Sequence, residues 1–241
     1  YLHGLEMICE SVIRFIRLRF GDDEPLAVET NTVPARLFPD LGADDLDGSW
    51  YALMEERYFR PIHEWHASRG LIFACDSGGR GLQPDEFGDY FRATRWYSAP
   101  GHDTPGGHAD LIKGKVSSSI ASLYRRPRVW LEGYHSLGWG ATPERLMFAT
   151  RENYLYGCTL LNLHGLYYST HGSFWEWAPP CHHFRMPYWE HMGVFLKYFE
   201  RLSYLLSQGT FVADVAVLYP VAPFEAGLDG VHRVAAQLEP A

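Results

Sequence analysis

Apolar side chains recur along this chain in two patterns, which predict different elements. Where they fall every third or fourth residue, the pattern predicts helices over residues 5–20, 49–68, 110–124, 143–156 and 187–208. Where they form short continuous runs, the pattern predicts strands over residues 70–75, 129–132, 159–164 and 212–219, and a short strand around residues 95–97 within the segment 92–100. Because strands alternate with helices, we expect an α/β fold with a parallel sheet.

Several element ends carry specific signals. Thr142 and Pro143 suit the N-cap and first turn of the helix that follows them. Gly209 suits the end of the helix over residues 187–208, and Pro220 should terminate the last strand. Pro61 should kink or split the helix over residues 49–68.

About four strand–helix units precede Gly209, which is half of an eight-unit barrel. The loops are long after each strand and short before it, as in barrels whose strand ends carry the site. The alternative is an open doubly wound sheet, but no strand is followed by a Gly-x-Gly-x-x-Gly run.

Composition narrows the class of protein. A hydrophobic fraction of 46% and a charged fraction of 21% are typical of globular domains. The net charge of -8, without a long basic run, argues against nucleic acid as a partner, and no apolar stretch is long enough to cross a membrane. The four cysteines are scattered without metal-ligand spacing. The high aromatic fraction, 15%, indicates either a large core or a cleft lined by rings.

Glu132 is the most informative residue. It closes an apolar run of three residues and stands immediately before Gly133. An acidic side chain is costly to bury, and the carboxyl ends of barrel strands carry the chemistry. We interpret Glu132 as catalytic; the alternative is a structural ion pair with an arginine.

Other polar and aromatic residues stand at comparable positions. Asp76 closes a strand, Asp103 lies in the Gly- and Pro-rich loop 100–108, and His164 ends a strand as Glu132 does. We interpret all three as contacts to a sugar, and the two aspartates also as candidates to hold a cation. The alternatives are a turn cap for Asp76, an Asx-turn for Asp103 and a core histidine for His164. His102 is a candidate hydroxyl partner, and with His108 a weaker metal candidate. Aromatic rings that could stack on a sugar are Tyr167, Tyr168, Trp175 and Trp177.

Six stretches of the chain, taken in order, resemble glycoside hydrolase family 106, the α-L-rhamnosidases and their relatives. They are residues 33–40, 114–121, 129–133, 164–168, 198–209 and 214–220. The resemblance implies the C-terminal half of a (β/α)8 barrel over residues 1–209. It also implies that residues 210–241 begin a further α/β domain.

The same resemblance implies inverting hydrolysis of α-L-rhamnosides in a glycan, with Glu132 as general base and calcium near the sugar. The general acid would lie upstream of Tyr1, so the chain would be an inactive piece of a larger protein. A secreted or periplasmic location is the expectation for that protein, and the chain itself carries no localisation signal. Loop 100–108 departs from the family, which tends to have acidic residues there. The alternatives are a carbohydrate-binding relative without catalysis and a structural α/β domain.

Overall fold

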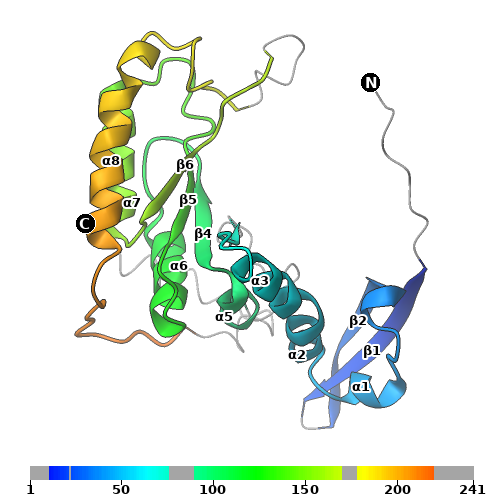
Figure 1. Ribbon diagram of the computed structural model, residues 1–241. Coiled ribbons are helices and arrows are strands. Elements are labelled where there is room, and N and C mark those ends of the chain that lie inside the picture. Colours follow the sequence, from blue (N-terminus) through cyan, green and yellow to red (C-terminus); the bar gives the residue numbers. More distant parts are fainter. Residues whose placement is uncertain (1–10, 22, 76–89, 170–177, 220–241) are drawn as a thin grey trace. The chain divides into compact units, whose positions relative to one another are not determined.

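The computed structural model of the protein describes residues 11–21, 23–75, 90–169 and 178–219. The chain forms two compact units, residues 1–62 and residues 63–241, and each is described by itself (Figure 1). None of the helices in the described part of the chain has both the length and the apolar composition needed to span a bilayer.

The first unit begins with a β-hairpin. Strand β1 (Val12–Gly21) pairs antiparallel with β2 (Glu24–Pro34), with a register irregularity between Arg19 and Phe20. The prediction of a helix over residues 5–20 is therefore wrong for its described part. Its apolar residues also alternate along a strand, so that Phe15 is buried while Ile16 is exposed. The pairing of β1 with β2 therefore stabilises the strand over the helix.

Short helices complete this unit and cover one side of the hairpin. They are η1 (Ala35–Leu37), α1 (Ala43–Asp47) and α2 (Trp50–Met54), the last capped by the Ser49 side chain. Their core contains Phe15, Val33, Phe38 and Trp50. The rings of Phe15 and Trp50 meet edge to face, with centroids 4.8 Å apart.

The predicted break near Pro61 takes the form of a π turn. After α2 the chain continues as the π-helical segment η2 (Glu55–Phe59) and then as α3 (Arg60–Ala67). Proline lacks an N–H and its ring clashes with the preceding turn. The wider π turn just before Pro61 relieves that conflict without ending the helix.

The second unit is built on a four-stranded parallel sheet in the order β3-β4-β5-β6. The strands are β3 (Ala74–Cys75), β4 (Ala99–Thr104), β5 (Trp130–Gly133) and β6 (Leu160–Leu163). The helical elements of this unit beyond α3 are α5 (Tyr90–Ala93), η3 (Thr94–Trp96), α6 (Leu111–Leu123), α7 (Pro143–Leu155), η5 (Trp189–His191) and α8 (Met192–Leu206). The helices predicted over 110–124, 143–156 and 187–208 are thus confirmed in outline, as is the Thr142 cap.

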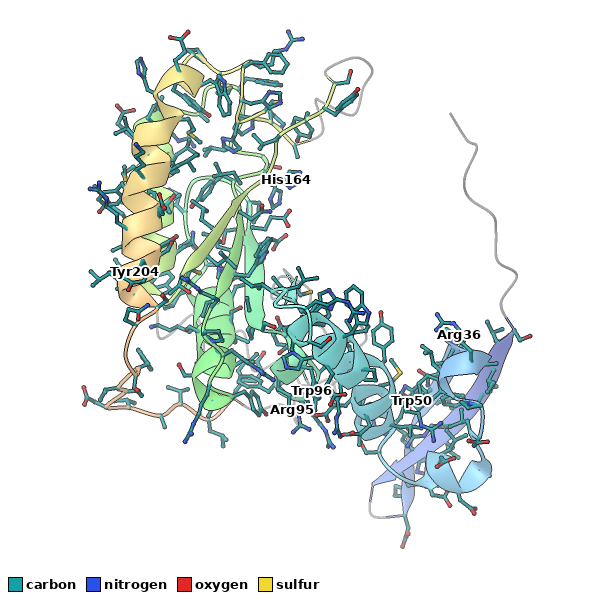
Figure 2. The ribbon with its side chains drawn as sticks, viewed as in Figure 1. Arg36, Trp50, Arg95, Trp96, His164 and Tyr204 are labelled. Atoms are coloured by element: carbon teal, nitrogen blue, oxygen red, sulfur yellow. The ribbon has the colours of Figure 1, made fainter. Side chains whose placement is uncertain are left out.

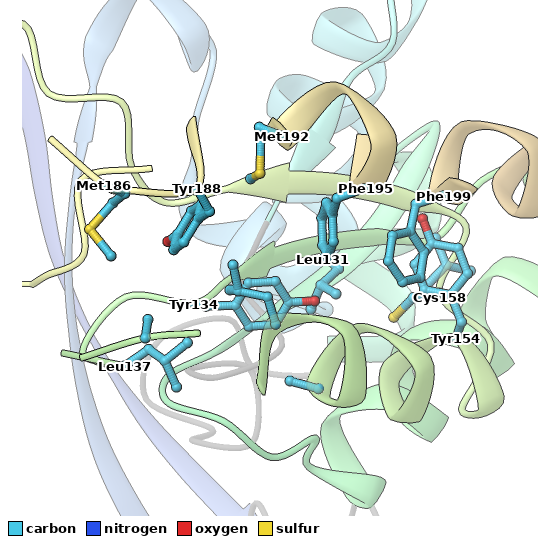
Figure 3. Close-up of a cluster of buried hydrophobic side chains, with 14 of the residues drawn as sticks. Leu131, Tyr134, Leu137, Tyr154, Cys158, Met186, Tyr188, Met192, Phe195 and Phe199 are labelled. Carbon is cyan, nitrogen blue, oxygen red and sulfur yellow. The ribbon is translucent and has the colours of Figure 1, made fainter. Parts of the chain in front are cut away.

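One face of the sheet is covered by helices. Leu131 of β5 is fully buried and joins a core with residues of α7 and α8, among them Tyr154, Phe195 and Phe199 (Figure 3). Because side chains alternate along a strand, Asp103 and Glu132 point to the opposite face. The sheet thus has one packed face and one face that carries carboxylates.

The packed face also contains a buried polar network, in which His102 Nδ1 has no hydrogen-bond partner. His102 Nε2 lies 3.2 Å from Asn153 Oδ1, and the Thr104 hydroxyl donates to the same oxygen at 3.3 Å. The Tyr134 hydroxyl donates to the Thr150 hydroxyl at 2.6 Å. All five side chains are buried, so their hydrogen bonds replace those lost to water.

The predicted fold class is contradicted. The described residues contain a hairpin and a separate parallel sheet, and they do not form a complete half of a (β/α)8 barrel. The strand predicted within residues 92–100 is displaced to β4, and 94–96 form a helical turn instead. Residues 210–219 have no regular secondary structure where the start of a further domain was expected. The predicted domain boundary at residue 209 stays a prediction.

Gly101 allows β4 and β5 to pair closely. A Cβ atom at this position would lie 2.4 Å from the Trp130 Cβ and 2.6 Å from the Trp130 carbonyl oxygen. We predict that Gly101→Ala lowers the free energy of unfolding by about 2 kcal/mol or more, since backbone has to move. Urea denaturation measures it. Gly140→Ala, with no atom within 4 Å of the added methyl, is the control, and equal midpoints for the two variants would contradict the packing.

Burial lowers the pKa of His102 below its ordinary value of 6.5. The unfolded chain then takes up a proton at this residue before the folded chain does, so stability should fall as pH drops below about 6.5. We predict that His102→Gln, which cannot be protonated, loses less stability than the wild type between pH 7 and pH 5. Urea denaturation at several pH values measures the difference. Parallel pH profiles for the two proteins would rule this out.

Candidate functional site

Parallel pairing places several polar side chains at one edge of the sheet. Asp103 of β4 pairs with Glu132 of β5, and Glu132 pairs with Asn162 of β6. Residues opposite each other in adjacent parallel strands project to the same face. Asp103, Glu132 and Asn162 therefore stand side by side on the face opposite Leu131, near the carboxyl ends of their strands.

A side-chain contact at this edge joins Glu132 and His164. The Glu132 Oε1 and His164 Nδ1 atoms are 2.9 Å apart, and His164 follows β6 directly (Figure 2). The two side chains are 24% and 25% exposed, so both are accessible to a small molecule while partly shielded from water. A carboxylate in such a setting can accept a hydrogen bond or ligate a cation.

His135 joins the pair from the loop after β5. Its ring centroid lies 5.3 Å from that of His164, with the planes tilted by 33°. Its Nε2 atom is 3.9 Å from Asp103 Oδ2, which links it to β4. Asp103 in turn forms an ion pair of 3.2 Å with Lys113 of α6. We call Asp103, Glu132, His135 and His164 the strand-end cluster.

Backbone hydrogen bonds hold the loops that carry the cluster. The Gly106 N–H donates to the His135 carbonyl oxygen at 2.9 Å, so the loop after β4 is tied to the loop after β5. The His164 N–H donates to the Gly133 carbonyl oxygen, which extends the β5–β6 pairing by one residue. The Asp110 side chain caps α6 by accepting from the Lys113 N–H, and this positions Lys113. These hydrogen bonds tie the loops that carry the cluster to each other and to the sheet.

Three members of the cluster have the composition of a metal site. One ligand atom each from Glu132, His135 and His164 lie within 4.8 Å of one another. Among the residues that the structure describes, no other group of three His, Cys, Asp or Glu side chains converges in this way.

The structure brings together only some of the residues predicted for the site. Glu132, Asp103 and His164 lie in the cluster. His102 is fully buried on the packed face and does not reach a ligand on the other one. Tyr168 is fully exposed. Asp76, Trp175 and Trp177 lie outside the described residues.

His108 does not approach His102. It is 83% exposed and its Nδ1 lies 3.8 Å from Glu152 Oε2. Lys113, by contrast, reaches the cluster without having been predicted, because a lysine inside a helix has no sequence signal for a site. His135 also belongs to the cluster, and it follows the end of β5 by two residues.

A separate groove lies elsewhere in the second unit. This groove, of about 910 Å³, runs along β6 and α8 and is lined mainly by apolar side chains with Arg128, Lys197 and Arg201. It contains none of the cluster residues. We place the functional site at the cluster, because converging polar side chains indicate a binding site more specifically than the volume of a groove does.

Comparison with known proteins gives two similarities. The family whose sequence pattern matches the chain is the UTRA domain, over residues 9–72, and this is a small regulatory ligand-binding domain of GntR-type repressors. In the solved structure of a rhamnosidase from Novosphingobium sp. PP1Y, a part is similar with 18% identity and a TM-score of 0.56. That match covers 69% of this chain and 17% of the rhamnosidase chain. No curated protein matches.

These comparisons correct the predicted family and activity. The UTRA match contradicts membership of a glycoside hydrolase family, and with it the prediction of a glycosidase acting on rhamnosides, because a UTRA domain is regulatory and not catalytic. The same finding contradicts the alternative, a carbohydrate-binding relative of the same barrel without catalysis. At 18% identity the rhamnosidase structure shows a similarity of fold alone.

Proposed function

We propose that this protein binds a small polar molecule at the strand-end cluster and serves as a ligand-binding component of a regulatory system. The observation that carries the proposal is the convergence of Asp103, Glu132, His135 and His164 at the carboxyl ends of three adjacent parallel strands. In open α/β sheets, ligands bind outside the carboxyl ends of the strands.

The cluster offers a balanced set of hydrogen-bonding groups. Glu132 and Asp103 accept hydrogen bonds, Lys113 donates, and each neutral imidazole does both. A ligand with several hydroxyl groups matches this set, because each hydroxyl is also donor and acceptor. The oligosaccharide or polysaccharide partner predicted from the sequence belongs to that class, and a single sugar ring would suffice.

The regulatory part of the proposal is supported by the UTRA match over residues 9–72. That match lies before the cluster in the sequence, so it supports the role and not the position of the site. The net charge of -8 supports a role in ligand binding and not in DNA binding for this chain.

The proposal predicts that a hydroxyl-bearing ligand depends on Glu132. Isothermal titration of the 241-residue protein, freed of metal, with a panel of monosaccharides, polyols and sugar acids should identify a binder. Glu132→Gln, which keeps the shape and removes the charge, should then weaken it by about 10-fold or more, as expected for a lost charged hydrogen bond.

Glu190→Gln is the matched control, since Glu190 is an exposed carboxylate in η5, away from the cluster residues in sequence. It should bind like the wild type. Equal affinity of Glu132→Gln and wild type for the identified ligand would remove the cluster from its binding site. Absence of any binder in the panel would count against a hydroxyl-rich ligand.

A further inference from the structure

Two imidazoles and one carboxylate converge from two neighbouring strands. Glu132 belongs to β5, His135 to the loop just after it, and His164 follows β6. Their ligand atoms lie within 4.8 Å of one another, and the Glu132–His164 contact is already 2.9 Å. Ligand atoms around a tetrahedral zinc ion are roughly 3.4 Å apart, given metal–ligand distances of about 2.1 Å. Small side-chain rotations would therefore complete the site.

The donor set selects the kind of metal. Imidazole nitrogen suits zinc and other divalent transition metals, and two histidines with one carboxylate is a common ligand set for them. Calcium takes six to eight oxygen ligands at 2.3–2.6 Å. Glu132 is the one oxygen donor in this triad, so the triad fits calcium, the metal implied by the sequence resemblance, less well than zinc.

The surroundings supply what a metal site needs besides its ligands. Asp103 Oδ2 lies 3.9 Å from His135 Nε2, and a carboxylate beside a ligating imidazole helps to orient the ring and raises its basicity. The Glu132 and His164 side chains are about one quarter exposed, which leaves an entry path. The pairing of β5 with β6 fixes the position of Glu132, and His135 and His164 follow these paired strands by two residues and one residue.

We propose that Glu132, His135 and His164 bind one divalent transition-metal ion, zinc above all, with at least one coordination position open toward solvent. An open coordination position distinguishes a catalytic or ligand-binding zinc site from a structural one. The inference goes beyond the proposed ligand-binding role, because metal binding is measured without any organic ligand.

The test uses the 241-residue protein after treatment with a chelator. Titration calorimetry with zinc chloride should show one site per chain, and calcium chloride should bind far more weakly. His135→Ala and His164→Ala should each weaken zinc binding by about 100-fold or more, and Asp103→Asn, which acts through His135, by about 10-fold. When cobalt(II) replaces zinc, the protein should show the visible absorption of a bound ion with nitrogen ligands. His164→Ala should abolish this absorption.

His108→Ala is the matched control, because His108 is an exposed histidine of the same unit that contacts Glu152 instead of the cluster. Its zinc affinity should equal that of the wild type. Where an alanine variant fails to fold, as judged by circular dichroism, the asparagine variant of the same histidine replaces it.

Three outcomes would overturn the proposal. They are the absence of saturable zinc binding, zinc binding that the cluster variants leave unchanged, and tighter binding of calcium than of zinc. Unchanged zinc binding would place the metal elsewhere, for example at Cys181 and His183, whose Sγ and Nε2 atoms are 2.8 Å apart. None of these outcomes decides the proposed function, since the panel of organic ligands is titrated into metal-free protein.

Discussion

The in-register parallel pairing of β4, β5 and β6 is the interaction on which the candidate site depends. It sets Asp103 beside Glu132 and brings the residues that follow β5 and β6 to the same edge. The pairing leaves no room for a side chain at position 101, where a Cβ atom would overlap Trp130. A glycine in the middle of a strand lowers stability through conformational entropy. At position 101 the missing side chain allows the two backbones to approach each other.

Strand alternation separates stability from chemistry in this sheet. Leu131 and His102 point to the helices, where the first packs against apolar residues and the second bonds to Asn153. Glu132 and Asp103 point the other way and remain partly exposed, which avoids the large cost of burying a carboxylate. The polar cluster can therefore change its contacts without disturbing the core.

Part of this arrangement could be predicted from the sequence. Thr142 and Pro143 mark the start of α7 by local hydrogen bonding and a fixed backbone angle, which depend on no distant residue. Glu132 and His164 both end strands, and parallel strand ends meet at one edge, so their proximity follows from topology alone.

The rest depends on contacts between distant segments. His102 and Asp103 are adjacent polar residues on one strand, so only one of them can face the site. The sequence does not say which one, because both are polar. The apolar residues of β1 fit a helix as well as a strand until β2 pairs with them. Lys113 reaches Asp103 because of where α6 lies against β4, which no local pattern encodes.

The most direct test of the account is the position of a bound ion in crystals of the protein grown with zinc, measured by anomalous scattering. The account predicts an anomalous peak within about 2.3 Å of ligand atoms of Glu132, His135 and His164. Strands out of this register, or a peak at other residues with the three side chains pointing apart, would contradict it.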